Sequence, residues 1–371
     1  MNNKTNKIRV LQLNLDGTGG AFSLIYQYGL ILNQSCLFDF YWPGNYFDSP
    51  KIDQLKKLGS KFYSDQSTGN RLIDHIILPF KFYKFLRSHK YSIIHINTDM
   101  AYKMAMYAIP AKLIGVQKII LHSHSSGING DHVYLKFIFH WLAKKFLLCS
   151  TKYVRISCSN LASKWMFNLK NDVTILKNAI NLDKFSYNEK SRNIIRNQLG
   201  VANKILLGMV GNLSFQKNPE FMIKILSHLD SKMILIFVGD GKNRKFLEKQ
   251  AEELNVKDRC LFLGNVNNVT DFLSAFDLYV MPSRFEGLPV SAVEAQANGL
   301  PCLLSDKITT EACLLPTCKR VSLYDKPSWI NSIINSSKFG HLKEAKQYLQ
   351  IAGFDINDAS KVLLKIYQFD Q

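Results

Sequence analysis

The segment ILLGMVGNLSFQKNPEFMIKILSHLDSKMILIFVGDG, residues 205–241, gives the clearest indication of the fold. Two short apolar runs, Ile205–Val210 and Met233–Val238, flank a longer segment with helical periodicity. Apolar runs that alternate with helical segments are typical of parallel βα units, because the connecting helices cover the faces of a parallel sheet. The stretch therefore predicts a strand–helix–strand unit of a doubly wound α/β sheet.

The same alternation extends in both directions from this unit. The further strands that it predicts are Ile8–Asn14, Leu37–Tyr41, Ile93–Asn97, Lys118–His122, Tyr153–Ser157, Cys260–Leu263, Leu278–Met281 and Cys302–Leu304. A chain of 371 residues exceeds the size at which a single core keeps growing. We therefore expect two sheets in series, whose carboxyl edges surround a common cleft where ligands of open α/β sheets bind.

A polar segment, residues 178–203, predicts the connection between the two domains. We place an N-terminal domain over residues 1–185 and a C-terminal domain over residues 186–353. The last stretch, residues 354–371, is helical and apolar on one face, and it can cross back to the N-terminal domain.

Positive charge is concentrated in the first half. Residues 1–185 hold 24 Lys and Arg against 10 Asp and Glu, and the rest holds 23 against 19. A basic half favours an anionic partner, such as a membrane surface, a phosphorylated lipid or a nucleic acid. Residues 78–91 and 133–148 interleave aromatic and basic side chains, which suits an anionic membrane surface. A lysine-rich soluble surface over buried aromatics is the alternative.

The seven cysteines are scattered and form no CxxC pair. This usage predicts reduced thiols, without a disulfide framework or a zinc site. The apolar run near the N-terminus stops at Asp16 and is too short for a signal peptide, and no run of about 20 apolar residues could span a bilayer. We therefore expect a cytoplasmic protein.

The segment PSRFEGLPVSAVEAQANGLP, residues 282–301, carries the strongest chemical signal. Pro289 suits the start of a helix and Gly299 its end, so a helix begins just after the loop that holds Glu286. The helix start presents backbone N–H groups and a positive dipole end, which together favour a phosphate. Glu294 can accept hydrogen bonds from a ribose diol, and Glu286 can reach a sugar hydroxyl. A solvated glutamate beside a capped helix is the alternative for either residue alone.

Two glutamates eight positions apart in an EGLPxxxxEAxAxGLP setting resemble the signature of glycosyltransferase family 4. This GT-B family of retaining enzymes includes bacterial members that build capsular and exopolysaccharide repeat units. The resemblance implies two Rossmann-like domains that face a central cleft, with Glu286 on the transferred sugar and Glu294 on the ribose. The neighbouring residues that it implies for donor binding are Gly287, Leu288, Pro289 and Val290.

Two further segments of the second half point to the same ligand. Lys217 lies at the expected start of a helix, where its ammonium can neutralise a departing diphosphate. The family resembled here has Arg at the place of Asn212, so Asn212 offers a hydrogen bond and no second cation. The turn with Gly239 and Gly241 resembles the turn beside the nucleotide in this family. On its own such a turn is weak evidence, because the third glycine of the dinucleotide fingerprint is absent.

In the first half, Gly19 and Gly20 follow the first strand, and a helix is expected from about Ala21. The resemblance implies that the backbone around Gly20 meets the donor and acceptor, and that His124 lies beside the transferred sugar. His122 and His124 point to opposite faces if their strand persists, so we expect no metal site there and a structural role for His122. A plain turn and a hydrogen-bonded loop histidine are the alternatives.

No two aspartates lie two positions apart, so the DxD motif that holds a divalent cation in the other large glycosyltransferase fold is absent. We expect neither a metal nor an organic cofactor, and we expect Lys217, Glu286 and His124 to be the catalytic residues. The sequence predicts a retaining transferase that moves a hexose or N-acetylhexosamine from a nucleotide-diphosphate sugar, with UDP expected, to a lipid-linked glycan of a bacterial surface polysaccharide. This function places it on the inner face of the cell membrane.

Two other functions stay open at this point. A nucleotide-sugar epimerase has the same double-Rossmann architecture. A basic nucleic-acid-binding protein would explain the charge, although no recognised nucleic-acid module is present.

Overall fold

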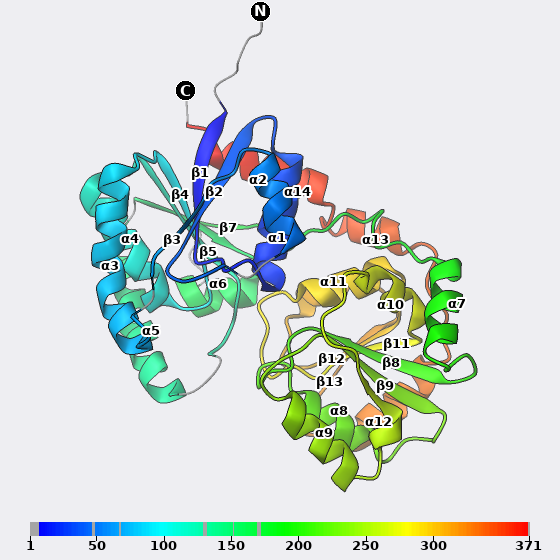
Figure 1. Ribbon diagram of the computed structural model, residues 1–371. Coiled ribbons are helices and arrows are strands. Elements are labelled where there is room, and N and C mark those ends of the chain that lie inside the picture. Colours follow the sequence, from blue (N-terminus) through cyan, green and yellow to red (C-terminus); the bar gives the residue numbers. More distant parts are fainter. Residues whose placement is uncertain are drawn as a thin grey trace, which may run out of the picture. The chain divides into compact units, whose positions relative to one another are not determined.

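The computed structural model describes residues 7–46, 49–66, 68–128, 132–150, 152–168 and 172–369. It contains two compact units. Unit 1 consists of Met1–Lys177 together with Ile356–Gln371, and unit 2 consists of Asn178–Asp355. Each unit has a parallel sheet with helices on both faces, which is a Rossmann-like arrangement (Figure 1).

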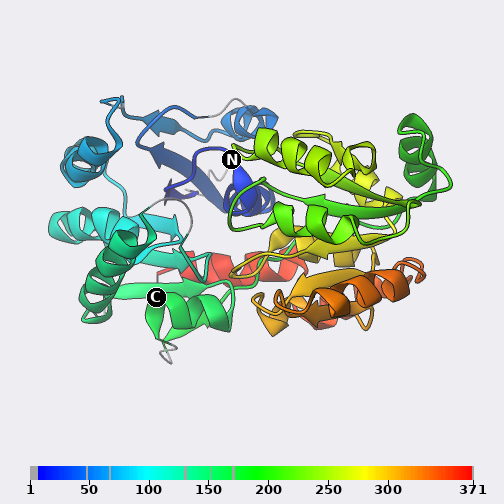
Figure 2. The same ribbon diagram turned by 90° about the horizontal axis from the view of Figure 1, so that it is seen from below.

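Among the described residues, unit 1 has a seven-stranded parallel sheet in the order β3-β2-β1-β4-β5-β6-β7. The strands are β1 (Ile8–Leu13), β2 (Cys36–Trp42), β3 (Phe62–Ser64), β4 (Ile93–Thr98), β5 (Lys118–Ser123), β6 (Tyr153–Ser157) and β7 (Val173–Ile175). The helices are α1 (Gly19–Ile31), α2 (Pro50–Lys57), α3 (Arg71–Ser88), α4 (Ala101–Ile114), α5 (Val133–Leu148), α6 (Asn160–Phe167) and α14 (Ile356–Tyr367). Helices α3, α4 and α5 cover one face, and α1, α2 and α14 cover the other (Figures 1 and 2).

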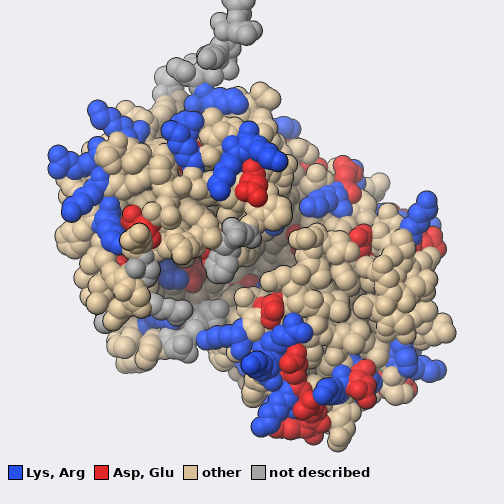
Figure 3. All heavy atoms as spheres, in the orientation of Figure 1, with Lys and Arg blue, Asp and Glu red and all other residues tan. Residues whose placement is uncertain are grey.

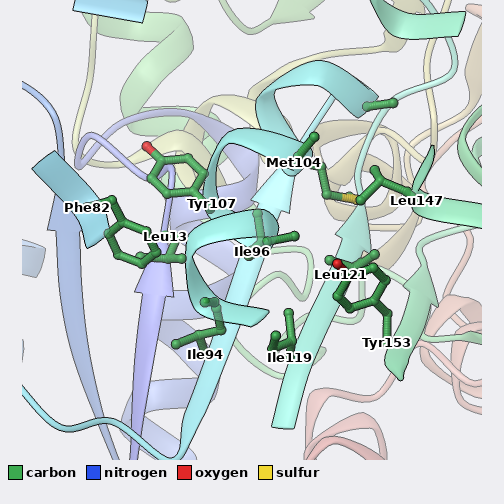
Figure 4. Packing of buried hydrophobic residues seen from close by; sticks show 14 of the residues in the cluster. Leu13, Phe82, Ile94, Ile96, Met104, Tyr107, Ile119, Leu121, Leu147 and Tyr153 are labelled. Carbon is green, nitrogen blue, oxygen red and sulfur yellow. The ribbon is translucent and has the colours of Figure 1, made fainter. Parts of the chain in front are cut away.

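The main core of unit 1 lies between the sheet and the helices α3, α4 and α5. Successive side chains of a strand point to opposite faces, so alternate residues of β1, β4 and β5 enter this core. The side chains that meet there include Leu13, Phe82, Ile94, Ile96, Met104, Tyr107, Ile119 and Leu121 (Figure 4). The intervening residues of the same strands are therefore left for the opposite face, which α14 helps to cover.

In the part of unit 2 that the structure describes, six parallel strands follow the order β10-β9-β8-β11-β12-β13. They are β8 (Ile205–Val210), β9 (Met233–Val238), β10 (Cys260–Phe262), β11 (Leu278–Met281), β12 (Cys302–Ser305) and β13 (Cys318–Val321). The helices are α7 (Glu189–Gln198), α8 (Pro219–Leu226), α9 (Arg244–Glu253), α10 (Val269–Ala275), α11 (Val290–Ala297), α12 (Lys326–Ser336) and α13 (Ala345–Ile351), with short 3₁₀ turns at Lys257–Arg259 and Thr310–Ala312. Side chains of α8, α9 and α12 form the main core with the sheet.

Every strand predicted from the sequence is present, but the predicted domain boundaries need correction. The first boundary follows Lys177 and not residue 185. The segment beyond it is held by unit 2, because Ile180 N donates to Phe354 O at 3.0 Å and Asn298 Nδ2 donates to Phe185 O at 3.0 Å. The second boundary follows Asp355, and α14 then packs on α1 of unit 1.

The segment expected to be an irregular connection contains a helix, α7. Its first turn is capped by Asn188, whose side-chain oxygen accepts from Ser191 N at 3.0 Å. Arg192 and Arg196 of this helix both bond to the carboxylate of Asp277. These ion pairs fix a helix that buries few apolar side chains.

Two further features concern the lengths of the helices and the state of the cysteines. None of the helices in the described ranges is long and apolar enough to cross a membrane. All seven cysteines are free thiols.

Candidate active site

Three loops meet at the carboxyl edge of the unit 2 sheet, after β8, β9 and β11. The first two are packed so closely that only glycine fits between them. Gly239 has φ +135°, and a Cβ atom on it would lie 2.1 Å from Gly211 O. A Cβ atom on Gly241 would lie 2.7 Å from Leu213 O and 2.8 Å from Asn212 Oδ1. The glycines of this turn thus let two backbone segments approach each other.

Lys217 and Glu286 form an ion pair in these loops. Lys217 Nζ lies 2.7 Å from Glu286 Oε1, and Glu286 is 7% exposed. The other carboxylate oxygen of Glu286 accepts from Gln216 Nε2 at 3.1 Å. The site therefore combines a cation with a carboxylate whose orientation is fixed from two sides.

Further hydrogen bonds fasten the loop after β8 to the loop after β11. Asn218 Nδ2 donates to Pro282 O at 3.0 Å, and Arg284 N donates to Gln216 O at 2.8 Å. Sequence reasoning missed Gln216, because its role depends on a partner 70 positions away in the chain. In the sequence, only its position next to Lys217 indicates that Gln216 belongs to the site.

Helix α11 begins directly after Pro289, as predicted, and no side chain caps its first turn. Within α11, Val290, Ser291 and Glu294 are only partly buried, while the other residues up to Ala297 are buried. Glu294 therefore lies on the accessible face of the helix, three residues beyond Ser291 and close to the helix start. The positive end of the helix dipole and the carboxylate belong to the same surface.

Tyr279 of β11 contacts the first turn of α11, and the sequence did not predict a role for it. Its buried hydroxyl donates to Ser291 Oγ at 2.9 Å. Burial raises the pKa of Tyr279 well above its ordinary value, and the charges of Glu294 and Glu286 raise it further. Both carboxylates thus lie near one neutral phenol. The structure brings Lys217, Glu286 and Glu294 together in unit 2.

Most of the other residues that were predicted to bind the donor pack against the protein itself. Gly287, Leu288 and Pro289 are buried, and Leu288 O accepts from Asn178 Nδ2. Asn212 is exposed and lies over Gly241. Asn212 therefore supplies no positive charge at the position where glycosyltransferase family 4, which the sequence resembles, has Arg.

Gly20 and His124 lie in unit 1, at the carboxyl edge of its sheet. Helix α1 begins at Gly19, two positions before the predicted start, and Gly19 has φ +76°. Gly20 is exposed in the first turn of this helix. His124 follows β5 directly and is partly exposed, with its Nε2 3.0 Å from Asn97 Oδ1.

The expectation that His122 and His124 point to opposite faces is wrong. Side chains two positions apart in a strand point to the same face, and His124 continues directly from the end of β5 at Ser123. Their ring centroids lie 3.9 Å apart with an interplanar angle of 39°. Among the described residues, no group of three or more His, Cys, Asp or Glu could hold a metal ion.

The arrangement in unit 2 suits a ligand with an anionic group and neighbouring hydroxyls. Lys217 and the start of α11 attract negative charge, while Glu286 and Glu294 accept hydrogen bonds from hydroxyl groups. A nucleoside diphosphate bound to a sugar has both features.

Comparison with known proteins agrees with this chemistry. A family model described as "Glycosyl transferases group 1" matches residues 191–313. EpsF of Bacillus subtilis (strain 168), a glycosyltransferase by its name, is 30% identical over 295 residues, which cover 75% of this chain and 74% of EpsF. The Escherichia coli UDP-Gal:alpha-D-GlcNAc-diphosphoundecaprenol alpha-1,3-galactosyltransferase is 28% identical over 265 residues, which cover 68% of each chain.

Solved structures share the fold over nearly the whole length. HepE of Anabaena, crystallised with UDP-glucose, superposes with a TM-score of 0.75 at 19% identity and covers 96% of this chain and 98% of its own. WaaG, a glycosyltransferase of lipopolysaccharide biosynthesis, has a TM-score of 0.73 at 15% identity and covers 98% of this chain and 100% of its own. Two parallel-sheet Rossmann-like units in this order are the GT-B fold.

Proposed function

Since this chain belongs to the glycosyl transferases group 1 family and is an enzyme that transfers sugars, we propose that it moves a hexose or N-acetylhexosamine from a UDP-sugar to a lipid-linked glycan with retention of configuration. The observation that carries this proposal is the gathering of Lys217, Glu286 and Glu294 at the start of α11. The activity in the name of the E. coli relative, galactosyl transfer from UDP-Gal to GlcNAc-diphosphoundecaprenol, supports the donor and acceptor classes.

In the proposed mechanism the diphosphate lies between the Lys217 ammonium and the first turn of α11. Negative charge grows on this diphosphate as the glycosidic bond breaks, so a fixed cation and oriented backbone dipoles lower the barrier. Removal of one such group typically slows an enzyme by about 10²–10³-fold. The close approach of Gly239 and Gly241 to the loop after β8 shapes the floor of this site.

The two glutamates and His124 have different proposed roles. Glu294 accepts hydrogen bonds from the ribose diol, and Glu286 and His124 hold the transferred sugar. Backbone near Gly20 meets the junction of sugar and acceptor. The proposed reaction uses neither a metal nor an organic cofactor, which the missing DxD motif supports.

The proposed acceptor brings the enzyme to the inner face of an anionic membrane. On α5, the exposed apolar side chains include Tyr134 at 78% and Phe139 at 58%, and α5 carries Lys136, Lys144 and Lys145 without an acidic residue. A cavity of about 300 Å³ between α3, α4 and α5 is lined by apolar side chains. Lys and Arg also outnumber Asp and Glu on the face of unit 1 visible in Figure 3.

A panel of UDP- and GDP-sugars tested for protection against thermal unfolding checks the donor site. A ligand at about 100 times its Kd stabilises the native protein by roughly 2.7 kcal/mol. Glu294→Ala should remove the protection, while the matched exposed variant Glu253→Ala should keep it. Unchanged protection in Glu294→Ala would refute the ribose contact. Release of UDP only when an acceptor is present would separate transfer from epimerisation of the donor.

A further inference from the structure

A buried polar network lies behind His124, on the α14 face of the unit 1 sheet. Gln12 of β1, His95 and Asn97 of β4, and Tyr367 of α14 are at most 1% exposed. Gln12, His95 and Asn97 occupy strand positions between the apolar residues of the main core, so they point to the opposite face, which α14 covers. A polar group buried this deeply is stable only if it is hydrogen-bonded.

Two chains of hydrogen bonds leave the Tyr367 hydroxyl. In the first, Tyr367 Oη lies 2.7 Å from His95 Nδ1. His95 Nε2 then lies 3.1 Å from His122 Nδ1. In the second, Gln12 Nε2 donates to Tyr367 Oη at 3.1 Å, and Asn97 Nδ2 donates to Gln12 Oε1 at 3.0 Å. Asn97 Oδ1 lies 3.0 Å from Nε2 of His124.

The second chain has a defined direction, which fixes the tautomer of His124. Gln12 uses its amide N–H toward Tyr367, so its oxygen accepts from the Asn97 amide. The Asn97 oxygen is then left facing His124, and it can only accept, so His124 must carry its proton on Nε2. Nδ1 of His124 is therefore the nitrogen with a free lone pair, and no described residue bonds to it.

The first chain is directed in the same way. The Tyr367 oxygen accepts from Gln12, so its proton is available to His95 Nδ1. His95 then carries its own proton on Nε2 and donates it to His122 Nδ1. His122 must hold its proton on Nε2, a buried atom that has no hydrogen-bond partner among the described residues.

The histidines of the network stay neutral at physiological pH, so each has a single tautomer. Burial, together with a smaller effect of the neighbouring His124, lowers the pKa of His95 to about 3. Burial lowers the pKa of His124 to about 4, against a raising effect of Asp99. A neutral imidazole whose Nδ1 is unprotonated accepts a hydrogen bond and cannot donate one there.

We propose that Tyr367 is a positioning residue which, through Gln12 and Asn97, fixes His124 with Nδ1 as an acceptor for a hydroxyl of the transferred sugar. The contact with sugar rests on the proposed function, whereas the tautomer of His124 does not. Helix α14 follows unit 2 in the chain and packs on unit 1, so the segment that joins the two units also orders a residue of the site.

Tyr367→Phe tests this proposal, because it removes one oxygen and keeps the ring against Phe38, where the two centroids lie 5.7 Å apart. We expect the ¹⁵N signals of His124 to change from one Nε2–H tautomer to a mixture of tautomers. With the proposed donor, kcat should fall about tenfold, while the KM for the UDP-sugar should change less than twofold, because unit 2 holds the nucleotide.

Tyr28→Phe is the matched control, because Tyr28 is a buried tyrosine of α1 whose hydroxyl has no partner in the described part of the chain. It should leave the His124 signals and kcat unchanged. An unchanged His124 tautomer in Tyr367→Phe would overturn the positioning role. Full turnover in His124→Ala would instead refute the sugar contact of the proposed function, while a change of the His124 tautomer in Tyr367→Phe would still support the positioning role.

Discussion

Lys217 and Glu286 are opposite charges 2.7 Å apart, and this pairing can be tested one residue at a time. Lys217→Met should reduce kcat by about 10²-fold, because it removes the cation that stabilises the leaving diphosphate. Glu286→Gln keeps the shape of the side chain and should lower kcat separately. If the two act only as a structural pair, the double variant will be no slower than either single variant in steady-state assays.

A substitution at Gly239 tests the packing of the two loops without changing the charges of Lys217 and Glu286. Gly239→Ala introduces a side chain at φ +135° and places a Cβ 2.1 Å from Gly211 O. We expect a loss of about 3 kcal/mol in the free energy of unfolding, from strain and from the displaced loop. Gly340→Ala is the control, since no heavy atom lies within 4 Å of its Cβ. Equal urea midpoints for both variants would contradict the proposed close approach.

The sequence allowed some of these residues to be predicted and not others. Glu286 and Glu294 share one loop and helix, so the sequence places them close together, and the family resemblance implies their roles. Gln216, Tyr279 and Tyr367 depend on contacts between distant segments, which spacing cannot reveal. The alternation along β1 and β4 does place Gln12 and His95 on one face, but the partner on α14 comes from the end of the chain.

At the scale of elements, the central strands were predictable because they are long and apolar. The short strands β3, β7 and β13 were missed: each spans three or four residues at the edge of a sheet, and none has a fully buried pattern. Helix α7 was missed because it is polar, with Ile195 and Arg196 as its buried residues. Ion pairs to Asp277 replace the apolar stripe on which recognition of a helix depends.

Helix α5 can be tested for binding to a membrane surface. Its apolar and basic side chains should bind vesicles that contain anionic lipid, and binding should weaken as salt rises. Changing Tyr134 and Phe139 together to Ser should reduce the partition coefficient at least tenfold in a sedimentation assay, because both side chains are exposed. Tyr324→Ser in unit 2, at a side chain 88% exposed, should have no effect. Equal binding by all three proteins would refute a contact through α5.

At the scale of the whole molecule, the two units differ in their response to acid. Burial lowers the pKa of His124 and of His140 to about 4 and that of His95 to about 3, and it lowers the pKa of His122 well below its ordinary value. All four lie in unit 1. His140 is held neutral by a bond in which its Nδ1 accepts from Ala101 N at 3.1 Å. In unit 2, burial lowers the pKa of His341.

This difference predicts that acid unfolds unit 1 first. The unfolded histidines bind protons near pH 6.5, whereas the folded ones resist them to about pH 4 or below, so the unfolded state holds more protons between these values. The stabilisation is complete above pH 6.5 and is lost as the pH falls, by about 1.4 kcal/mol per pH unit for each histidine. As the pH falls from 7.5 to 6 and 5, calorimetry should show that the unfolding transition of unit 1 moves to lower temperature. This transition should not respond to UDP. A UDP-sensitive transition that shifts as much, or one that rises in acid, would contradict this assignment.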